Sequence, residues 1–164
     1  MSSTERLLAN AEHYASTYPD QAPPGRPSSG VAIVACMDAR IDVYRLFGLD
    51  PGQAHVIRNA GGLVTDDAIR SLAISQRFLG TEEIILVHHT SCGMQGLDDD
   101  EFAAQLERET GTRPPWRAGG FTDAAADVRA SAAALRQSPY LARRDRLRGF
   151  VFDVETGRLD EVDL

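Results

Sequence analysis

Two apolar runs, each followed by a polar cluster with a cysteine, constrain this sequence more than any other feature. The runs are Val31–Ala35 and Ile84–His88, and the cysteines are Cys36 and Cys92, which are the only two in the chain. The first run is continuous and rich in β-branched residues, as is typical of a strand covered on both faces. Because ligands bind beyond the carboxyl ends of strands in parallel sheets, we expect the two clusters to share one site.

Helical and extended patterns alternate along the chain. The sequence predicts helices over residues 4–18, 41–47, 65–79, 98–109 and 122–136, and strands over residues 31–35, 54–57, 81–88, 149–154 and 159–162. Between the first predicted helix and the first predicted strand, the prolines and glycines of residues 18–30 predict a loop. Strands alternating with helices indicate an α/β fold whose sheet is mostly parallel. The 164 residues are enough for one domain that buries roughly two-thirds of its unfolded surface.

Composition restricts the partners and the compartment. Apolar residues make up 43% and charged residues 25% of the chain, as in ordinary globular proteins, and the net charge is −7. Such a charge argues against nucleic acid or an anionic membrane as the main partner. No run approaches the roughly 20 apolar residues of a membrane span, and residues 1–6 do not resemble a secretory signal. We therefore expect a cytoplasmic protein with reduced cysteines.

The side chains in the two clusters predict a zinc site. Cys36, His89 and Cys92 supply two thiolates and an imidazole, a set that zinc takes when a fourth position stays open for chemistry. This pattern points to a hydrolytic or hydrating enzyme. His88 competes with His89, but neighbouring strand residues face opposite sides and the spacing to Cys92 favours His89. We therefore expect His88 to pack beneath the site or to bond a backbone carbonyl. The alternative for Cys36 alone is a buried structural cysteine.

Two further groups of residues are candidates for the same site. Asp38 and Arg40 follow Cys36 at intervals of two, so an extended segment would place all three on one side. An aspartate beside an arginine stays ionised and can accept a hydrogen bond from an attacking hydroxide, or it can bind the metal itself and close the site. A surface salt bridge is the alternative. Residues 58–62 follow the predicted strand 54–57 and should lie beside the cysteine clusters. The glycines of this segment could expose N–H groups to a small oxyanion, which makes Asn59, Gly61 and Gly62 candidate substrate-binding residues, or the segment could simply form a tight turn.

These motifs resemble those of the β-class carbonic anhydrases, in particular of their compact bacterial subgroup. The resemblance consists of CxDxR at residues 36–40, HxxC at residues 89–92 and Arg-Asn-Ala-Gly at residues 58–61 between them, and it is close over residues 31–95. It implies a single α/β/α domain over residues 1–164 with four parallel strands and an antiparallel edge strand. Residues 1–30 would form an N-terminal helix and a Pro/Gly/Ser loop, and residues 31–95 the core of the zinc site.

The resemblance also implies an activity and an assembly. The expected reaction is the reversible hydration of carbon dioxide to bicarbonate, with one zinc per chain held by Cys36, His89 and Cys92, and Asp38 and Arg40 as a catalytic dyad. Some members exchange Asp38 between zinc and Arg40. The expected assembly is a homodimer or a tetramer. The subgroup also resembles hydrolases of carbonyl sulfide or carbon disulfide, and a non-enzymatic sensor of zinc or bicarbonate is a third possibility.

Overall fold

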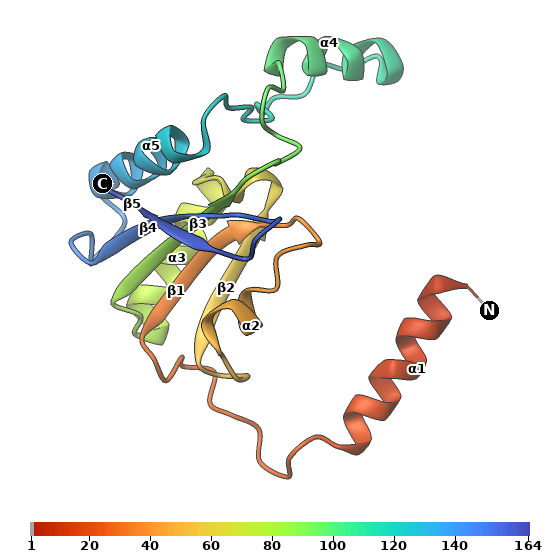
Figure 1. Cartoon of the computed structure of the whole chain (residues 1–164), viewed down its shortest axis with the longest axis vertical. Coiled ribbons are helices and arrows are strands. Elements are labelled where there is room, and N and C mark those ends of the chain that lie inside the picture. Colours follow the sequence, from red (N-terminus) through yellow and green to blue (C-terminus); the bar gives the residue numbers. More distant parts are fainter. Residues whose placement is uncertain (1) are drawn as a thin grey trace.

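The computed structural model of the protein describes residues 2–164 and contains a five-stranded sheet flanked by helices (Figure 1). In chain order the elements are α1 (Ser3–Ser16), β1 (Val31–Cys36), α2 (Val43–Phe47), β2 (Ala54–Asn59), the 3₁₀ turn η1 (Ala60–Gly62), α3 (Asp66–Leu79), β3 (Glu83–His89), α4 (Asp99–Thr110), α5 (Ala124–Gln137), β4 (Leu147–Phe152) and β5 (Leu159–Val162).

The sheet confirms the expected α/β class. Its strand order is β2-β1-β3-β4-β5, in which the first four strands are parallel and β5 is antiparallel to β4. β1 lies between β2 and β3, and its residues from Ala32 onward are buried, as its uninterrupted apolar run predicts. Consequently the carboxyl ends of β1 and β3 are neighbours, and the two cysteine clusters that follow these strands meet there.

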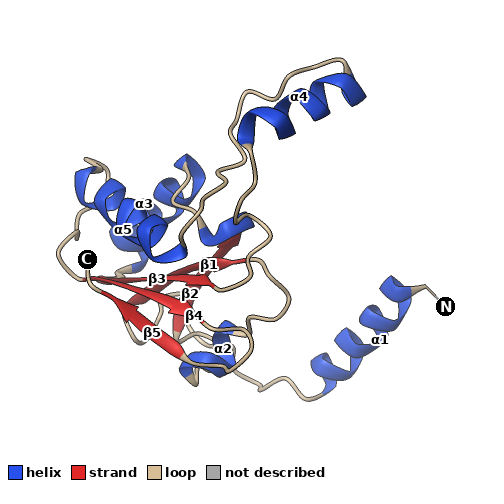
Figure 2. Cartoon of the chain, turned by 45° about the horizontal axis from the view of Figure 1, so that its top comes forward, coloured by secondary structure: helices blue, strands red, loops and turns tan. Residues whose placement is uncertain are grey.

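The two faces of the sheet are covered by different helices. α3 and α5 pack on one face, where Leu72 and Leu135 join alternate residues of β1 and β3 in a buried cluster. The short helix α2 lies on the opposite face and contributes Val43 to a second cluster, which also contains both cysteines (Figure 2). Burying a leucine such as Leu72 contributes about 1.5–3 kcal/mol. The site is therefore built into the edge of a core rather than into a surface loop.

Several strands extend further than the sequence indicated. We expected Cys36 to follow its strand, but it is the last residue of β1 and pairs with Asn59, the last residue of β2. β3 likewise continues through His89, beyond its predicted end at residue 88. In contrast, the predicted helix 41–47 begins only at Val43, because the Asp42 side chain caps it by accepting a hydrogen bond from the backbone N–H of Arg45.

Two segments stand away from the sheet. Helix α1 extends from one end of the molecule and contains no buried residue, and α4 extends from another end (Figure 1). The segment that carries α4, residues 97–120, is called the α4 arm below. None of the helices in residues 2–164 has the length and apolar character needed to cross a lipid bilayer.

Candidate metal centre

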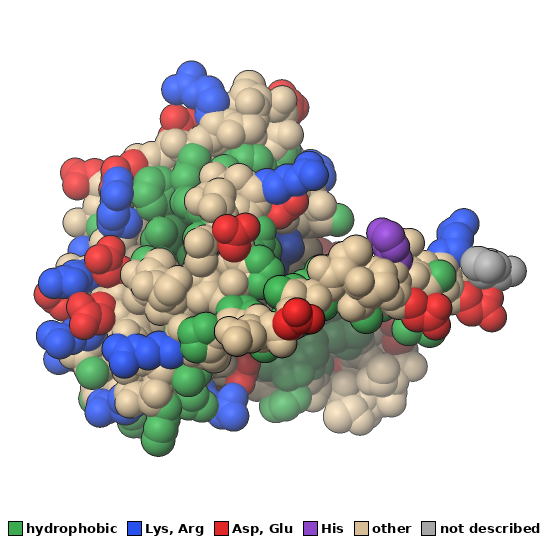
Figure 3. All heavy atoms as spheres, turned by 90° about the horizontal axis from the view of Figure 1, so that it is seen from below, with side chains coloured by type: hydrophobic (Ala, Val, Ile, Leu, Met, Phe, Trp, Pro, Cys, Tyr) green, Lys and Arg blue, Asp and Glu red, His purple; other side chains and the backbone are tan. Residues whose placement is uncertain are grey.

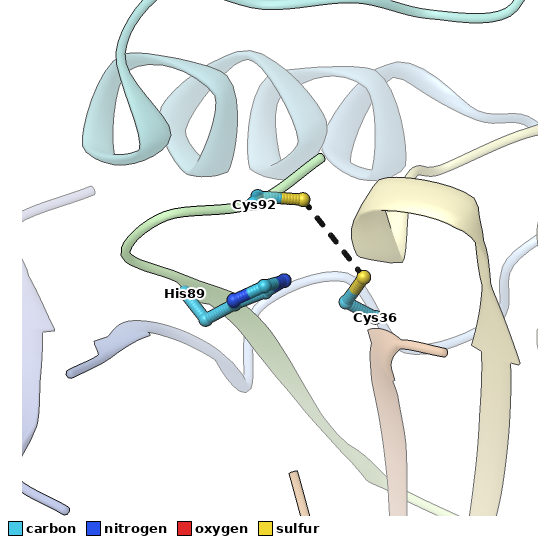
Figure 4. A group of neighbouring side chains, drawn as sticks. All are labelled: Cys36, His89 and Cys92. Atoms are coloured by element: carbon cyan, nitrogen blue, oxygen red, sulfur yellow. Dashed lines mark hydrogen bonds between the residues drawn. The ribbon is translucent and has the colours of Figure 1, made fainter. Parts of the chain in front are cut away.

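The structure brings three of the predicted ligand residues into one buried group. Cys36 projects from the end of β1, His89 from the end of β3, and Cys92 from the turn that follows (Figure 4). Their candidate ligand atoms all lie within 4.8 Å of one another, and the two sulfur atoms are 3.9 Å apart. Neither sulfur belongs to a disulfide. Residues separated by 56 positions are thus held together by neighbouring strands.

The hydrogen bonding of His89 leaves one ring nitrogen facing this group. Its Nδ1 lies 2.9 Å from the carbonyl oxygen of Thr90, so Nδ1 carries the proton and donates it there. Nε2 is consequently unprotonated, and it is buried without a hydrogen-bond partner. Burial also lowers the pKa of His89, which keeps the ring neutral. A buried acceptor without a partner is unfavourable unless a ligand such as a metal ion uses its lone pair.

The spacing of the sulfur atoms also fits a metal ion. Two thiolates bound tetrahedrally to one zinc ion at about 2.3 Å stand roughly 3.8 Å apart. The distance between the sulfur atoms of Cys36 and Cys92 is 3.9 Å. Burial raises the pKa of the Cys92 thiol, and a bound dication would reverse this effect by stabilising the thiolate. The donor set, two sulfurs and one imidazole nitrogen, is one that zinc prefers, and it leaves one tetrahedral position for another ligand.

The dyad lies beside this group. The Asp38 carboxylate accepts hydrogen bonds from Arg40 Nε at 2.9 Å, Nη2 at 2.7 Å and the backbone N–H at 2.9 Å. These bonds hold the pKa of Asp38 far below its usual range, so the carboxylate stays ionised. Arg40 Nη2 also donates to the carbonyl of Ser91, next to Cys92. One oxygen of Asp38 lies 3.8 Å from the unpartnered Nε2 of His89, so the carboxylate faces the candidate metal position while paired with Arg40.

Asn59, Gly61 and Gly62 form the turn between β2 and α3. The Asn59 amide donates to the carbonyl of Leu63 and accepts from its N–H, both at 2.8 Å, which closes the turn. Gly61 and Gly62 are buried and have φ of 81° and 72°. A Cβ on Gly62 would lie 2.8 Å from the backbone nitrogen of Cys36. These contacts give the three residues a role in shaping the strand end, and contact with substrate stays a prediction.

The other histidines lie outside the group. His88 is fully buried, and its Nε2 lies 2.6 Å from the carboxylate of Asp127 on α5. The sequence suggested packing beneath the site or a bond to a backbone carbonyl, and a carboxylate on a helix could not be anticipated from spacing. His55 contacts the hydroxyl of Ser75 at 2.7 Å, and His13 lies on the exposed helix α1.

Sequence reasoning did not identify the part that Arg58 plays in this site. Its Nε donates to the carbonyl of Cys36 at 2.9 Å, and its Nη2 donates to the carbonyl of Asp38 at 2.7 Å. The sequence placed Arg58 only in a segment beside the cysteine clusters. The available signal was its position immediately after the predicted strand 54–57, in the segment expected beside the cysteine clusters.

Comparisons with known proteins agree with this fold and this group of residues. The family described as carbonic anhydrase matches residues 31–111. Beta-carbonic anhydrase 1 of Mycobacterium tuberculosis is 55% identical over 99% of both chains. A crystal structure of carbonic anhydrase from Streptococcus mutans superimposes with a TM-score of 0.92, at 41% identity over 99% of both chains. Carbon disulfide hydrolase of Acidithiobacillus thiooxidans is 35% identical over 77% of this chain and 74% of its own.

The parallel sheet with cysteine and histidine at adjacent strand ends therefore defines a carbonic anhydrase fold, and the chain belongs to the carbonic anhydrase family. Identity of 55% over the whole chain places it in the β class of that family, whose members are zinc enzymes.

Proposed function

We propose that this protein catalyses the zinc-dependent, reversible hydration of carbon dioxide to bicarbonate, with one zinc ion per chain held by Cys36, His89 and Cys92. The observation that carries the proposal is the unpartnered, buried Nε2 of His89 facing two sulfur atoms beside an ionised carboxylate. A purely structural zinc site would need no such carboxylate. The 55% identity with a β-carbonic anhydrase supports the choice of substrate.

The residues of the chain have distinct roles in this reaction. When bound, zinc would acidify a water molecule and so supply a nucleophile for CO₂ near neutral pH. The bond from His89 Nδ1 to Thr90 fixes the ring so that Nε2 faces the metal position. Asp38, held ionised by Arg40, is an acceptor that orients the attacking oxygen and keeps its lone pair toward the carbon. If the pairing with Arg40 were lost, the same carboxylate could bind the metal and close the site.

We place the substrate near the turn of Asn59, Gly61 and Gly62. This turn follows β2, whose last residue pairs with Cys36, so it adjoins the candidate metal position. Its glycines allow the backbone to approach closely, which suits a small oxyanion such as bicarbonate.

The direct test combines metal analysis with kinetics. Purified protein should contain close to one zinc per chain and accelerate CO₂ hydration in a stopped-flow assay with a pH indicator. Cys36→Ser and His89→Ala should lose most of the metal and the activity, whereas His55→Ala, outside the site, should keep both. Full zinc content in Cys92→Ser would refute the assignment of the ligands.

Hydrolysis of carbon disulfide or carbonyl sulfide is the second candidate. It is supported by the 35% identity with the carbon disulfide hydrolase of Acidithiobacillus thiooxidans. Release of H₂S from CS₂ or COS, without CO₂ hydration, would favour it over the first proposal. A zinc-loaded protein that is inactive in both assays would favour the sensor.

We further propose that the chain forms a homodimer or a tetramer in the cytoplasm. α1 has no buried residue, and its Leu7, Leu8 and Tyr14 side chains are more than half exposed, which suits contact with a second copy. The two free cysteines are consistent with a reducing compartment.

A further inference from the structure

Arg58 connects two strand ends through its side chain. It lies near the carboxyl end of β2, opposite Ala35 of β1. Its guanidinium crosses to the neighbouring segment and donates to the carbonyls of Cys36 and Asp38, at 2.9 and 2.7 Å. Cys36 is the last residue of β1. Beyond it the N–H of Met37 donates to the carbonyl of Asn59 at 2.8 Å, and Arg58 holds the carbonyls of the residues on either side of Met37. One side chain thus fixes a candidate metal ligand and the dyad aspartate together.

The backbone of Asp38 determines where its carboxylate lies. Its carbonyl accepts from Arg58 Nη2 at 2.7 Å and from the N–H of Ile41 at 3.1 Å. Within residues 2–164, the hydrogen bonds to its carboxylate all come from Arg40. One carboxylate oxygen is 3.8 Å from Nε2 of His89. A small movement of this segment would therefore carry the carboxylate from Arg40 toward the metal-binding atoms.

We propose that Arg58 is a positioning residue: by bonding the carbonyls of Cys36 and Asp38, it holds residues 36–38 so that the Asp38 carboxylate pairs with Arg40 and leaves the fourth metal position open. The proposal rests on the zinc site proposed above. Arginine suits this role because its planar guanidinium offers several donors in a fixed arrangement, whereas lysine is a single point of charge. Arg58 acts through Asp38 and needs no contact with the substrate.

The test uses Arg58→Met, which keeps much of the side-chain volume, and Arg58→Lys, which keeps the charge. Arg70→Met is the matched control, because Arg70 lies on α3 and makes one exposed ion pair, with Asp67 at 3.4 Å. Each protein is loaded with Co²⁺, and its visible spectrum is followed as azide is added. In the wild type azide should take the open position and change the spectrum. Arg58→Met should lose this response because Asp38 occupies the position, Arg58→Lys should keep part of it, and Arg70→Met should keep all of it.

A double-mutant cycle shows whether Arg58 acts through Asp38. Arg58→Met alone should lower kcat/KM for CO₂ by about 10- to 100-fold, as is usual for residues that orient the ligands of a metal site. In the Asp38→Ala background it should cause no further loss, and the azide response should return. An unchanged azide response in Arg58→Met, or an equal loss of kcat/KM in both backgrounds, would overturn the proposal.

The outcomes also separate this proposal from the proposed function. If Arg58→Met binds no cobalt, the azide response of Arg58→Lys tests the proposal instead. A response equal to that of the wild type would refute the positioning role of Arg58, and a reduced response would support it. The cobalt spectra require no CO₂. Wild-type protein that responds to azide but does not hydrate CO₂ would refute the proposed function, while the loss of that response in Arg58→Met would still support the role of Arg58.

Discussion

At the scale of the single residue, the Asp38 side chain has the most direct consequence for activity. Arg40 lowers the pKa of Asp38, so the carboxylate stays an acceptor throughout the neutral and mildly acidic range. Asp38→Ala should lower kcat for CO₂ hydration by about 10²- to 10⁴-fold, the range typical of a positioned acid–base group. Zinc content should stay near that of the wild type, because the three proposed ligands remain. Stopped-flow kinetics and metal analysis on the same sample measure both quantities.

The comparison variant is Asp67→Ala, which removes a carboxylate that is 79% exposed on α3. It should leave both the rate and the zinc content unchanged. Wild-type hydration by Asp38→Ala, with its zinc retained, would leave the dyad with a structural role only and would refute the orienting role of Asp38.

Gly62 has a second consequence at this scale, and it concerns stability. Its φ is 72°, and a Cβ would lie 2.8 Å from the backbone nitrogen of Cys36 and 3.0 Å from the carbonyl oxygen of Val87. Both neighbours are backbone atoms of central strands and cannot move independently. Gly62→Ala should therefore reduce the free energy of unfolding by about 1–3 kcal/mol, measured by urea denaturation. Gly25→Ala, where a Cβ would meet nothing within 4 Å, should have little effect, and equal stability of the two variants would contradict this explanation.

At the scale of the element, Asp99 of α4 anchors the last part of the α4 arm. This part, residues 117–120, is called the return segment below. The Asp99 carboxylate accepts from the N–H groups of Gly119 and Gly120 and from Arg117 Nε, each at 2.9 Å. Asp99→Ala should free the return segment, so that trypsin cleaves after Arg117 faster than in the wild type. Asp100→Ala is the matched control, because Asp100 is 85% exposed and pairs with Arg113 at 3.3 Å. Mass spectrometry of the early fragments identifies the cleaved bond, and identical rates in both variants would contradict the anchor.

The same anchor should depend on pH. The N–H of Gly120, followed by Arg117 and the N–H of Gly119, lowers the pKa of Asp99 from its ordinary value of 3.8. A carboxyl group whose pKa is lower in the folded than in the unfolded chain stabilises the fold fully above the unfolded value, and this contribution is lost as the pH falls toward the folded value. Cleavage at Arg117 in the wild type should therefore be slow at neutral pH. Below the ordinary pKa range of carboxyl groups, an acid-stable protease should cleave the arm faster as the pH falls. Faster cleavage as the pH rises would contradict this direction of the pH dependence.

Element types followed from the sequence more fully than element ends did. The apolar run Val31–Ala35 was sufficient to predict β1, because a buried strand of this composition depends on local physics. Strand ends depend on pairing with a distant partner. Cys36 extends β1 because Asn59 lies opposite, and no local signal in residues 31–40 indicates this. The three candidate ligands could be named in advance, whereas the bonds from Arg58 and the partner of His88 required the fold.

At the scale of the whole molecule, α1 is a helix that contributes no residue to the core of its own chain. It begins with a capping box between Ser2 and Glu5, yet none of its residues is buried. An isolated helix of 14 residues is marginal in water, so contact with another surface would stabilise it. Figure 3 shows the helix extending from the main body, with apolar side chains visible on both. A second copy of the chain can supply that surface.

Leu7→Glu tests this assembly. Leu7 is 67% exposed in the single chain, and burying such a side chain at a subunit contact contributes about 1.5–3 kcal/mol. The wild type should sediment at micromolar concentration with at least twice the monomer mass of 17.8 kDa, and Leu7→Glu should shift toward that mass. Ala9→Glu adds the same charge on the opposite side of the helix and should keep the assembly of the wild type. A wild type that sediments as a monomer, or equal dissociation of both variants, would refute a dimer held by the apolar side of α1.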